Sequence, residues 1–285
     1  MELPFELDLK KKVAVVTGGA GVLCSTFAEA LAEAGASVAI LDINLEEAEK
    51  VADKINAGGG FALAIKTNIL EKESLEAARK KVREKMGSCD ILINGAGGNH
   101  PSGTTSKDYL EPKDLEAVEE DITTFFDLDA GGIQFVFNLN FLGALLTSQV
   151  FAQDMAKKES STIINVSSMN AFTPLTRIPA YSGAKAAVSN FTQWLAVHLS
   201  KVGVRVNALA PGFFETEQNQ ALLRDEDGDY SARAKKILGQ TPMDRFGEPE
   251  ELLGTLFWLV SPKASGFVTG TVIPIDGGFS AYSGV

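Results

Sequence analysis

The 285-residue sequence has only two cysteines, Cys24 and Cys89, which lie far apart and match no metal-ligand spacing. We therefore expect reduced thiols, as in a cytosolic protein, and no metal centre. The sequence also lacks an excess of positive charge, because 37 acidic residues outnumber 26 Lys and Arg and give a net charge of −11. Without a basic stripe, the chain is not expected to bind nucleic acid.

Long apolar segments are missing as well. The first twelve residues, MELPFELDLKKK, lack the apolar core and small-residue cleavage site of a secretory signal. No apolar run reaches the length that a membrane span requires. With 45% hydrophobic and 22% charged residues, the composition is typical of a soluble globular protein, and its length fits one α/β domain. We therefore predict a cytoplasmic protein with no membrane partner.

A glycine turn near the N-terminus separates two apolar patterns. A β-branched run covers residues 12–17, a helical pattern covers 25–36, and a second buried run covers 37–42. Where a strand, a glycine turn and a helix follow one another, backbone N–H groups and the helix N-terminus attract a pyrophosphate, and glycines allow its close approach. The arrangement predicts a dinucleotide-binding unit.

Asp42 closes the second of these strands. A carboxylate there accepts hydrogen bonds from ribose hydroxyls and repels a 2′-phosphate, so NAD(H) is favoured over NADP(H). The alternative is that Asp42 only caps the helix that follows.

Tyr181 and Lys185 lie four residues apart in a run of helical periodicity, so both side chains should project from one helix face. A nearby cation favours the ionised form of a phenol, which suits Tyr181 for acid–base work on an alcohol or ketone. Ser168 ends an apolar run, residues 161–168, and can hold the same substrate oxygen. An isolated Tyr-x-x-x-Lys pair is more often two surface neighbours, so the rest of the chain must support this reading.

Several further motifs support it: TGGAG at 17–21, NGAG at 94–97, NLNFLG at 138–143, RVNALAPG at 205–212 and VIPIDGG at 272–278. With Ser168, Tyr181 and Lys185, these motifs resemble the short-chain dehydrogenase/reductase family, in family order from about residue 10 to 279. The phrases GGNHP, SSMNAFTPLT and DGGFSAYSGV are similar to its branch of D-mannonate oxidoreductases, or fructuronate reductases.

The resemblance implies a catalytic set and a cofactor site. The catalytic set is Asn140, Ser168, Tyr181 and Lys185, with Asn140 supporting a proton relay and Lys185 binding the nicotinamide ribose. The chain departs from the family pattern at Val22 and Cys24, which replace glycines, and at Gly95, which replaces an asparagine. The implied NAD(H) contacts are Gly18, Gly19, Gly21, Val22, Leu23, Asp42, Asn68, Ile69, Asn94, Ala96, Gly97, Tyr181, Lys185, Pro211, Gly212, Phe213, Phe214 and Thr216.

Two segments are candidates for substrate binding. Residues 99–126 form a long connection that leaves the C-terminal end of a strand and should overhang the crevice. Residues 215–241 resemble the family's mobile substrate loop, where Gln218, Asn219 and Arg224 are candidate contacts. Arg177 could hold a carboxylate or simply face solvent. His100 could bind substrate, or it could do no more than hydrogen-bond to nearby backbone groups. The predicted substrate site comprises Asn99, His100, Ser168, Asn170, Arg177 and Tyr181.

Six or seven short apolar strands alternate with helices, which predicts a single-domain, doubly wound, Rossmann-type parallel sheet of seven strands with helices on both faces. The resemblance implies an NAD(H)-dependent enzyme that reduces D-fructuronate to D-mannonate and forms a homotetramer. Its partner is a small anionic sugar acid. Alternatives are another sugar-acid or polyol dehydrogenase, such as gluconate 5-dehydrogenase, or a catalytically silent NAD-binding sensor.

Overall fold

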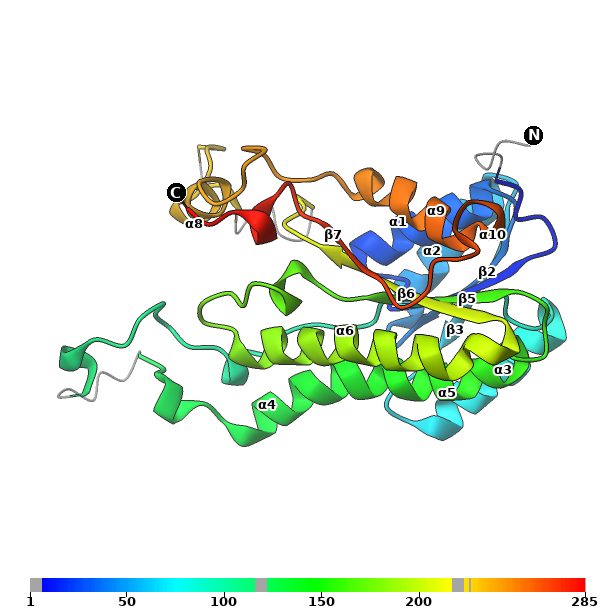
Figure 1. Ribbon diagram of the computed structural model, residues 1–285, viewed down its shortest axis with the longest axis horizontal. Helices are drawn as coiled ribbons and strands as arrows, with labels where there is room; N and C mark the ends of the chain where they lie inside the picture. Colours follow the sequence, from blue (N-terminus) through cyan, green and yellow to red (C-terminus); the bar gives the residue numbers. More distant parts are fainter. Residues whose placement is uncertain (1–6, 116–121, 217–222, 226, 285) are drawn as a thin grey trace.

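The computed structural model describes residues 7–115, 122–216, 223–225 and 227–284. Its centre is a seven-stranded, fully parallel sheet in the order β3-β2-β1-β4-β5-β6-β7 (Figure 1). The predicted fold class is therefore confirmed. The strands are β1 Val13–Thr17, β2 Ser37–Asp42, β3 Phe61–Lys66, β4 Ile91–Asn94, β5 Ser161–Val166, β6 Val204–Pro211 and β7 Val272–Ile275.

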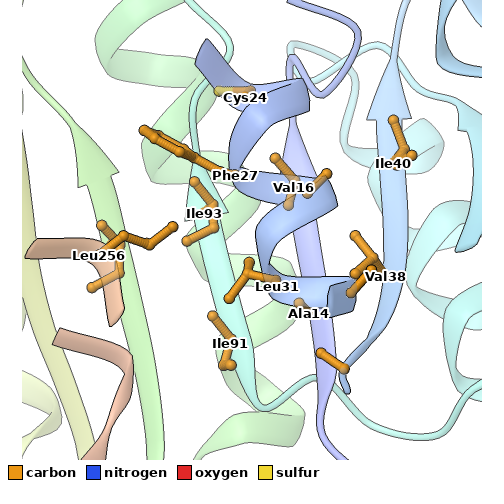
Figure 2. Packing of buried hydrophobic residues seen from close by; sticks show 14 of the residues in the cluster. Ala14, Val16, Cys24, Phe27, Leu31, Val38, Ile40, Ile91, Ile93 and Leu256 are labelled. Carbon is orange, nitrogen blue, oxygen red and sulfur yellow. The ribbon is translucent and has the colours of Figure 1, made fainter. Parts of the chain in front are cut away.

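Helices cover both faces of this sheet. One apolar core joins the sheet to α1, α2 and α9, and a second joins it to α3, α5 and α6. Figure 2 shows the first core, where Phe27 and Leu31 of α1 pack over Val16 of β1 and Ile93 of β4. The helices are α1 Val22–Glu33, α2 Leu45–Ala57, α3 Lys72–Lys85, α4 Ala130–Phe137, α5 Gly143–Met155, α6 Pro179–Leu199, α8 Ala232–Leu238, α9 Leu253–Val260 and α10 Pro262–Ser265.

The order of the strands reverses at β1, which pairs with β2 on one side and β4 on the other. Thr17 at the end of β1 lies opposite Leu41 of β2 and Asn94 of β4. The connections from β1 and β4 therefore leave in opposite directions and open a crevice at the carboxyl ends of the strands.

The helical periodicity of residues 126–156 predicts one long helix with Asp129 as its N-cap, and the structure builds this helix from three pieces. It begins at Ala130, and the predicted N-cap Asp129 accepts a hydrogen bond from the Gly132 N–H at 2.6 Å. A π-helical turn, Asn138–Leu142, separates α4 from α5. The extra residue of a π turn disturbs the helical hydrogen bonds, a feature common at functional sites.

The same helix corrects one expectation from the sequence. The segment Ala130–Met155 is long and apolar enough to cross a membrane by length and composition, with a mean hydropathy of 1.4. In the fold, α4 contacts α6, and α5 contacts α3 and the sheet. Because core helices of soluble proteins meet the same criterion, this segment alone is weak evidence for a membrane span.

Short 3₁₀ turns carry the connections beyond the strand ends. In the insert, η1 is Pro101–Gly103, η2 is Pro112–Leu115 and η3 is Phe125–Asp127. Both the insert and α8 extend past the carboxyl ends of the strands (Figure 1). The candidates Gln218 and Asn219 lie outside the described residues. The remaining turns are η5 Met169–Ala171, η6 Ser200–Val202, η7 Pro249–Leu252 and η8 Phe279–Ala281.

Candidate active site

A cleft of about 820 Å³ lies along the carboxyl ends of the strands, at the strand-order reversal. Asp42 lines one part of it, and Ser168, Tyr181 and Lys185 line another. Fourteen predicted site residues line this cleft: Gly18, Gly21, Val22, Leu23, Asp42, Asn68, Ile69, Ala96, Gly97, Ser168, Tyr181, Lys185, Pro211 and Gly212.

The glycine turn brings backbone close to the cleft. Gly18 has a left-handed φ of +62°, and a Cβ there would lie 2.7 Å from the Ala96 Cα, so glycine is required on both grounds. Gly21 is the N-cap of α1. The Asp42 Oδ2 accepts a hydrogen bond from the Ala20 N–H at 3.1 Å, which ties the predicted ribose-binding carboxylate to the turn.

The two departures from the family pattern at Cys24 and Gly95 fit each other. A Cβ added to Gly95 would overlap the Cys24 Sγ and lie 2.9 Å from the Thr17 carbonyl oxygen. The buried thiol therefore occupies space that a side chain at position 95 would need. Burial raises the pKa of Cys24 to about 12, so it is a neutral packing group.

The i, i+4 pair on α6 forms as predicted. The Lys185 Nζ lies 5.5 Å from the centre of the Tyr181 ring, and it donates a hydrogen bond to the Val166 carbonyl oxygen at 2.8 Å. Lys185 is only 4% exposed. Gly97 makes room for it, because a Cβ there would lie 3.2 Å from the Nζ.

Burial shifts the pKa values of these two groups in opposite directions. Burial raises the pKa of Tyr181 to about 12, although a hydrogen bond with Ser168 lowers it in part. Burial also lowers the pKa of Lys185 to about 8. The phenol of Tyr181 is therefore protonated at neutral pH.

Asn140 lies in the π turn, is 2% exposed and clamps the chain after β4. Its side-chain amide donates to the carbonyl oxygens of Gly98 at 2.7 Å and Val136 at 2.8 Å, and its Oδ1 accepts from the Gly98 N–H at 3.2 Å. Asn140 thus fixes the loop that passes beside Lys185.

Other predicted cofactor residues lie outside the cleft lining. Asn94 is buried, and its amide donates to Ser148 at 2.9 Å and Asn165 at 2.8 Å, so its side chain links β4 to α5 and to β5. A Cβ on Gly19 would lie 2.8 Å from the Ile40 side chain, which makes this glycine a packing requirement. Phe213 and Phe214 follow β6 and line a smaller cavity of about 100 Å³, and Thr216 lies half-buried beyond them.

The predicted substrate residues divide into two groups. Asn170 is 4% exposed next to Ser168 and is not among the residues that line the cleft, and its buried Oδ1 has no partner among the described residues. Asn99 and His100 make local contacts, because Asn99 donates to Thr104 at 2.9 Å and the His100 Nδ1 accepts from the Ser102 N–H at 3.2 Å.

The two candidate arginines are both ion-paired. Arg177 pairs with Asp108 at 3.0 Å. Arg224 forms a bidentate pair with Glu215 at 2.6 and 3.1 Å. Neither is simply a solvent-facing cation.

Some cleft residues were not predicted from the sequence. Phe135 and Leu139 of the long helix line the cleft, and the Phe135 ring lies 5.1 Å from the His100 ring. Their i, i+4 spacing indicates that they share one helix face, but it does not distinguish a face that lines a cleft from one that packs in the core. The other such residues are Ala20, Cys24, Leu41, Ile43, Asn44, Glu47, Thr67, Leu70, Gly95, Val166 and Ser167.

A dinucleotide cleft with a Ser, Tyr and Lys set at one end defines an oxidoreductase site, and comparison with known proteins agrees. The family model for short chain dehydrogenases matches residues 12–227, and this chain belongs to that family. The prediction of an NAD-dependent oxidoreductase acting on CH–OH groups is thereby confirmed for the class of enzyme and for the cofactor.

Three relatives are similar over nearly the whole chain. A Haemophilus influenzae crystal structure with bound NAD, provisionally assigned as a D-mannonate oxidoreductase, is 57% identical with a TM-score of 0.94, and each chain covers 100% of the other. An uncharacterized oxidoreductase of Bacillus subtilis, UxuB, is 50% identical over 99% of this chain and 100% of its own. The 5-keto-D-gluconate 5-reductase of Escherichia coli K12 is 31% identical, with 95% and 96% coverage.

The depressed pKa of Lys185 predicts a pH-dependent stability. Between about pH 8 and its ordinary value of 10.5, the unfolded state binds more protons than the folded state, so wild-type stability rises with pH. We expect the stability advantage of Lys185→Met over wild type to fall by about 3 kcal/mol from pH 7 to pH 10.5, since one pKa unit corresponds to about 1.4 kcal/mol. Urea unfolding of the cofactor-free proteins measures this, and a pH-independent difference would contradict it.

The fit between Cys24 and Gly95 predicts energetic coupling. Gly95→Ala should destabilise the protein by about 1–3 kcal/mol, as overpacking does. In a Cys24→Ala background the cost should fall by at least about 0.5 kcal/mol, because the overlapping Sγ is gone. Cys89→Ala, which removes the other buried thiol, is the matched control and should leave the cost unchanged. Additive effects of Cys24→Ala and Gly95→Ala on the urea midpoint would refute the coupling.

Proposed function

We propose that this enzyme interconverts a sugar-acid ketone and its alcohol, and that its reaction is the reduction of D-fructuronate to D-mannonate with NADH. The observation that carries the proposal is the meeting of Ser168, Tyr181 and Lys185 in a cleft that also contains Asp42. A silent NAD-binding sensor has no need of a proton-transfer group, so this set favours an enzyme.

The chain's own residues supply proton transfer and orientation. The phenol of Tyr181 donates its proton to the substrate oxygen in reduction, and the phenolate takes it back in oxidation. Ser168 holds the same oxygen through its hydroxyl. The pKa of about 12 keeps Tyr181 protonated at neutral pH, which suits the reducing direction. A bound nicotinamide dinucleotide supplies the hydride.

The cleft fits that cofactor. The glycine turn at Gly18 leaves room for close approach of phosphate groups, and Asp42 would accept hydrogen bonds from the adenosine ribose and repel a 2′-phosphate. Lys185 would hold the nicotinamide ribose. We therefore propose NAD(H) over NADP(H).

Support for a sugar-acid substrate comes from two relatives. One is the Haemophilus influenzae structure provisionally assigned as a D-mannonate oxidoreductase, and the other is the Escherichia coli 5-keto-D-gluconate 5-reductase. Reduction of 5-keto-D-gluconate is the second candidate, because the latter relative covers 95% of this chain. Both reactions use the same chemistry on a keto acid.

We also propose a cytoplasmic homotetramer, by analogy with the family. Two exposed apolar side chains of α6, Trp194 at 58% and Val197 at 77%, are compatible with burial between subunits. Molecular mass in solution tests the assembly.

The direct test is the oxidation of NADH and, separately, of NADPH by the purified enzyme, with D-fructuronate, D-tagaturonate and 5-keto-D-gluconate as substrates. We expect turnover with D-fructuronate and NADH. Turnover confined to another ketone would show that this ketone, and not D-fructuronate, is the substrate. Preference for NADPH would contradict the role of Asp42.

Tyr181→Phe is the control for mechanism in the same assay. It should lower turnover by at least about 10²-fold, because general acid catalysis contributes about 10²–10⁴-fold, while NADH binding stays unchanged. Wild-type protein that binds NADH but turns over no ketone would favour the sensor.

A further inference from the structure

Asp108, in the insert after β4, contacts two cations. Its Oδ1 lies 3.0 Å from the Arg177 Nε, and its Oδ2 contacts the Lys236 Nζ. Thr176 donates a further hydrogen bond to Oδ1 at 3.0 Å. One carboxylate therefore serves three donors, and the attraction lowers the pKa of Asp108 below its usual range.

These contacts join three segments that are far apart in the sequence. Asp108 belongs to the insert, Arg177 to the connection between β5 and α6, and Lys236 to α8. The backbone of Arg177 is also anchored to the insert, because its carbonyl oxygen accepts a hydrogen bond from the Thr105 N–H at 2.8 Å. Arg177 adopts a left-handed φ of 72°, which such anchoring can maintain.

The cluster lies next to the catalytic helix. Arg177 is four residues before Tyr181, and α6 begins two residues after Arg177 at Pro179. A Cβ on Gly103 of the insert would lie 3.4 Å from the Ala180 Cβ, so the insert packs on the turn that carries Tyr181. The cluster therefore lies at the start of the helix that carries Tyr181, beyond the residues that line the cleft.

The charges of the cluster do not balance. Counting only residues that the structure describes, Arg177 and Lys236 share the single carboxylate of Asp108, so the cluster has one more cation than anion. Arg224, in contrast, is neutralised by its own bidentate partner Glu215. Among the described residues, Asp108 accepts a hydrogen bond from Arg177 only at the Nε. The two Nη groups of Arg177 therefore remain to bind a planar anion.

We propose that Asp108 is a positioning residue that holds Arg177 and Lys236 together as the binding site for the substrate carboxylate. This inference rests on the proposed sugar-acid function. In a keto acid of six carbons, the carboxylate lies several bonds from the ketone, so one molecule extends from Tyr181 to a neighbouring cation. An overall acidic protein needs such a local positive site to bind an anion.

Asp108→Asn separates three explanations. If Asp108 positions the cations, the KM for the keto acid should rise about ten-fold or more with little change in kcat, since a hydrogen bond to a charged group is lost. If only net charge matters, removing a negative charge should lower KM. If Asp108 is structural or inert, KM and kcat should shift together or stay unchanged. Either of the last two results would overturn the proposal.

Glu111→Gln is the matched control. Glu111 lies in the same insert and pairs with Lys107 at 3.1 Å and Lys113 at 3.0 Å rather than with Arg177 or Lys236. The Glu111→Gln substitution removes the same negative charge as Asp108→Asn and should leave the KM for the keto acid unchanged. NADH affinity and the thermal midpoint should be unaffected in both variants.

Lys236→Met provides a second route should Asp108→Asn not fold, because Lys236 is an exposed side chain. It should also raise KM for the keto acid by about ten-fold. The substrate assays use whichever keto acid the wild type reduces. Failure of the wild type to reduce any keto acid would reject the proposed function, whereas wild-type turnover with unchanged KM in the variants would reject only this inference.

Discussion

The buried ammonium of Lys185, held on the Val166 carbonyl oxygen, is the constraint around which the site is arranged. Desolvation of this charge lowers its pKa to about 8, and burial keeps the neighbouring Tyr181 phenol neutral. The surroundings are fitted to the lysine: Gly97 leaves space for it, and Asn140 fixes the adjacent backbone at Gly98. No carboxylate pairs with this cation in the described part of the chain, and burial of an unpaired charge is costly, which is consistent with the chemical role that we propose for it.

Much of the fold could be predicted because its signals are local. Short β-branched runs alternating with helical periodicity determine a parallel sheet, and Asp129 was identified as a helix cap from neighbouring residues alone. Tyr181 and Lys185 were predictable as a pair for the same reason, since four residues along a helix place both side chains on one face. The raised pKa of Tyr181 could not be predicted, because burial is a tertiary property that residue spacing does not report.

The unpredicted parts depend on contacts between distant segments. Cys24 and Gly95 each look like a defect in a family pattern, yet together they form one packed pair. The π turn contains Asn140, whose side-chain amide bonds to the distant Gly98 as well as to the Val136 carbonyl oxygen of its own helix. Asp108 and Lys236 are 128 positions apart, so a charged residue in the long insert gave no indication of its partner. These contacts join the insert, the loop before α6 and α8.

The central claim is that Tyr181 is the proton-transfer group and that its acidity depends on what fills the cleft. At a pKa of about 12, roughly one molecule in 10⁵ carries the phenolate at neutral pH, too few for efficient oxidation. The decisive measurement is the tyrosinate absorbance of wild type minus Tyr181→Phe as a function of pH, with and without NAD⁺. The account predicts titration near pH 12 in the free enzyme and a clearly lower pKa with the cationic nicotinamide bound. A pKa that NAD⁺ leaves unchanged would contradict it.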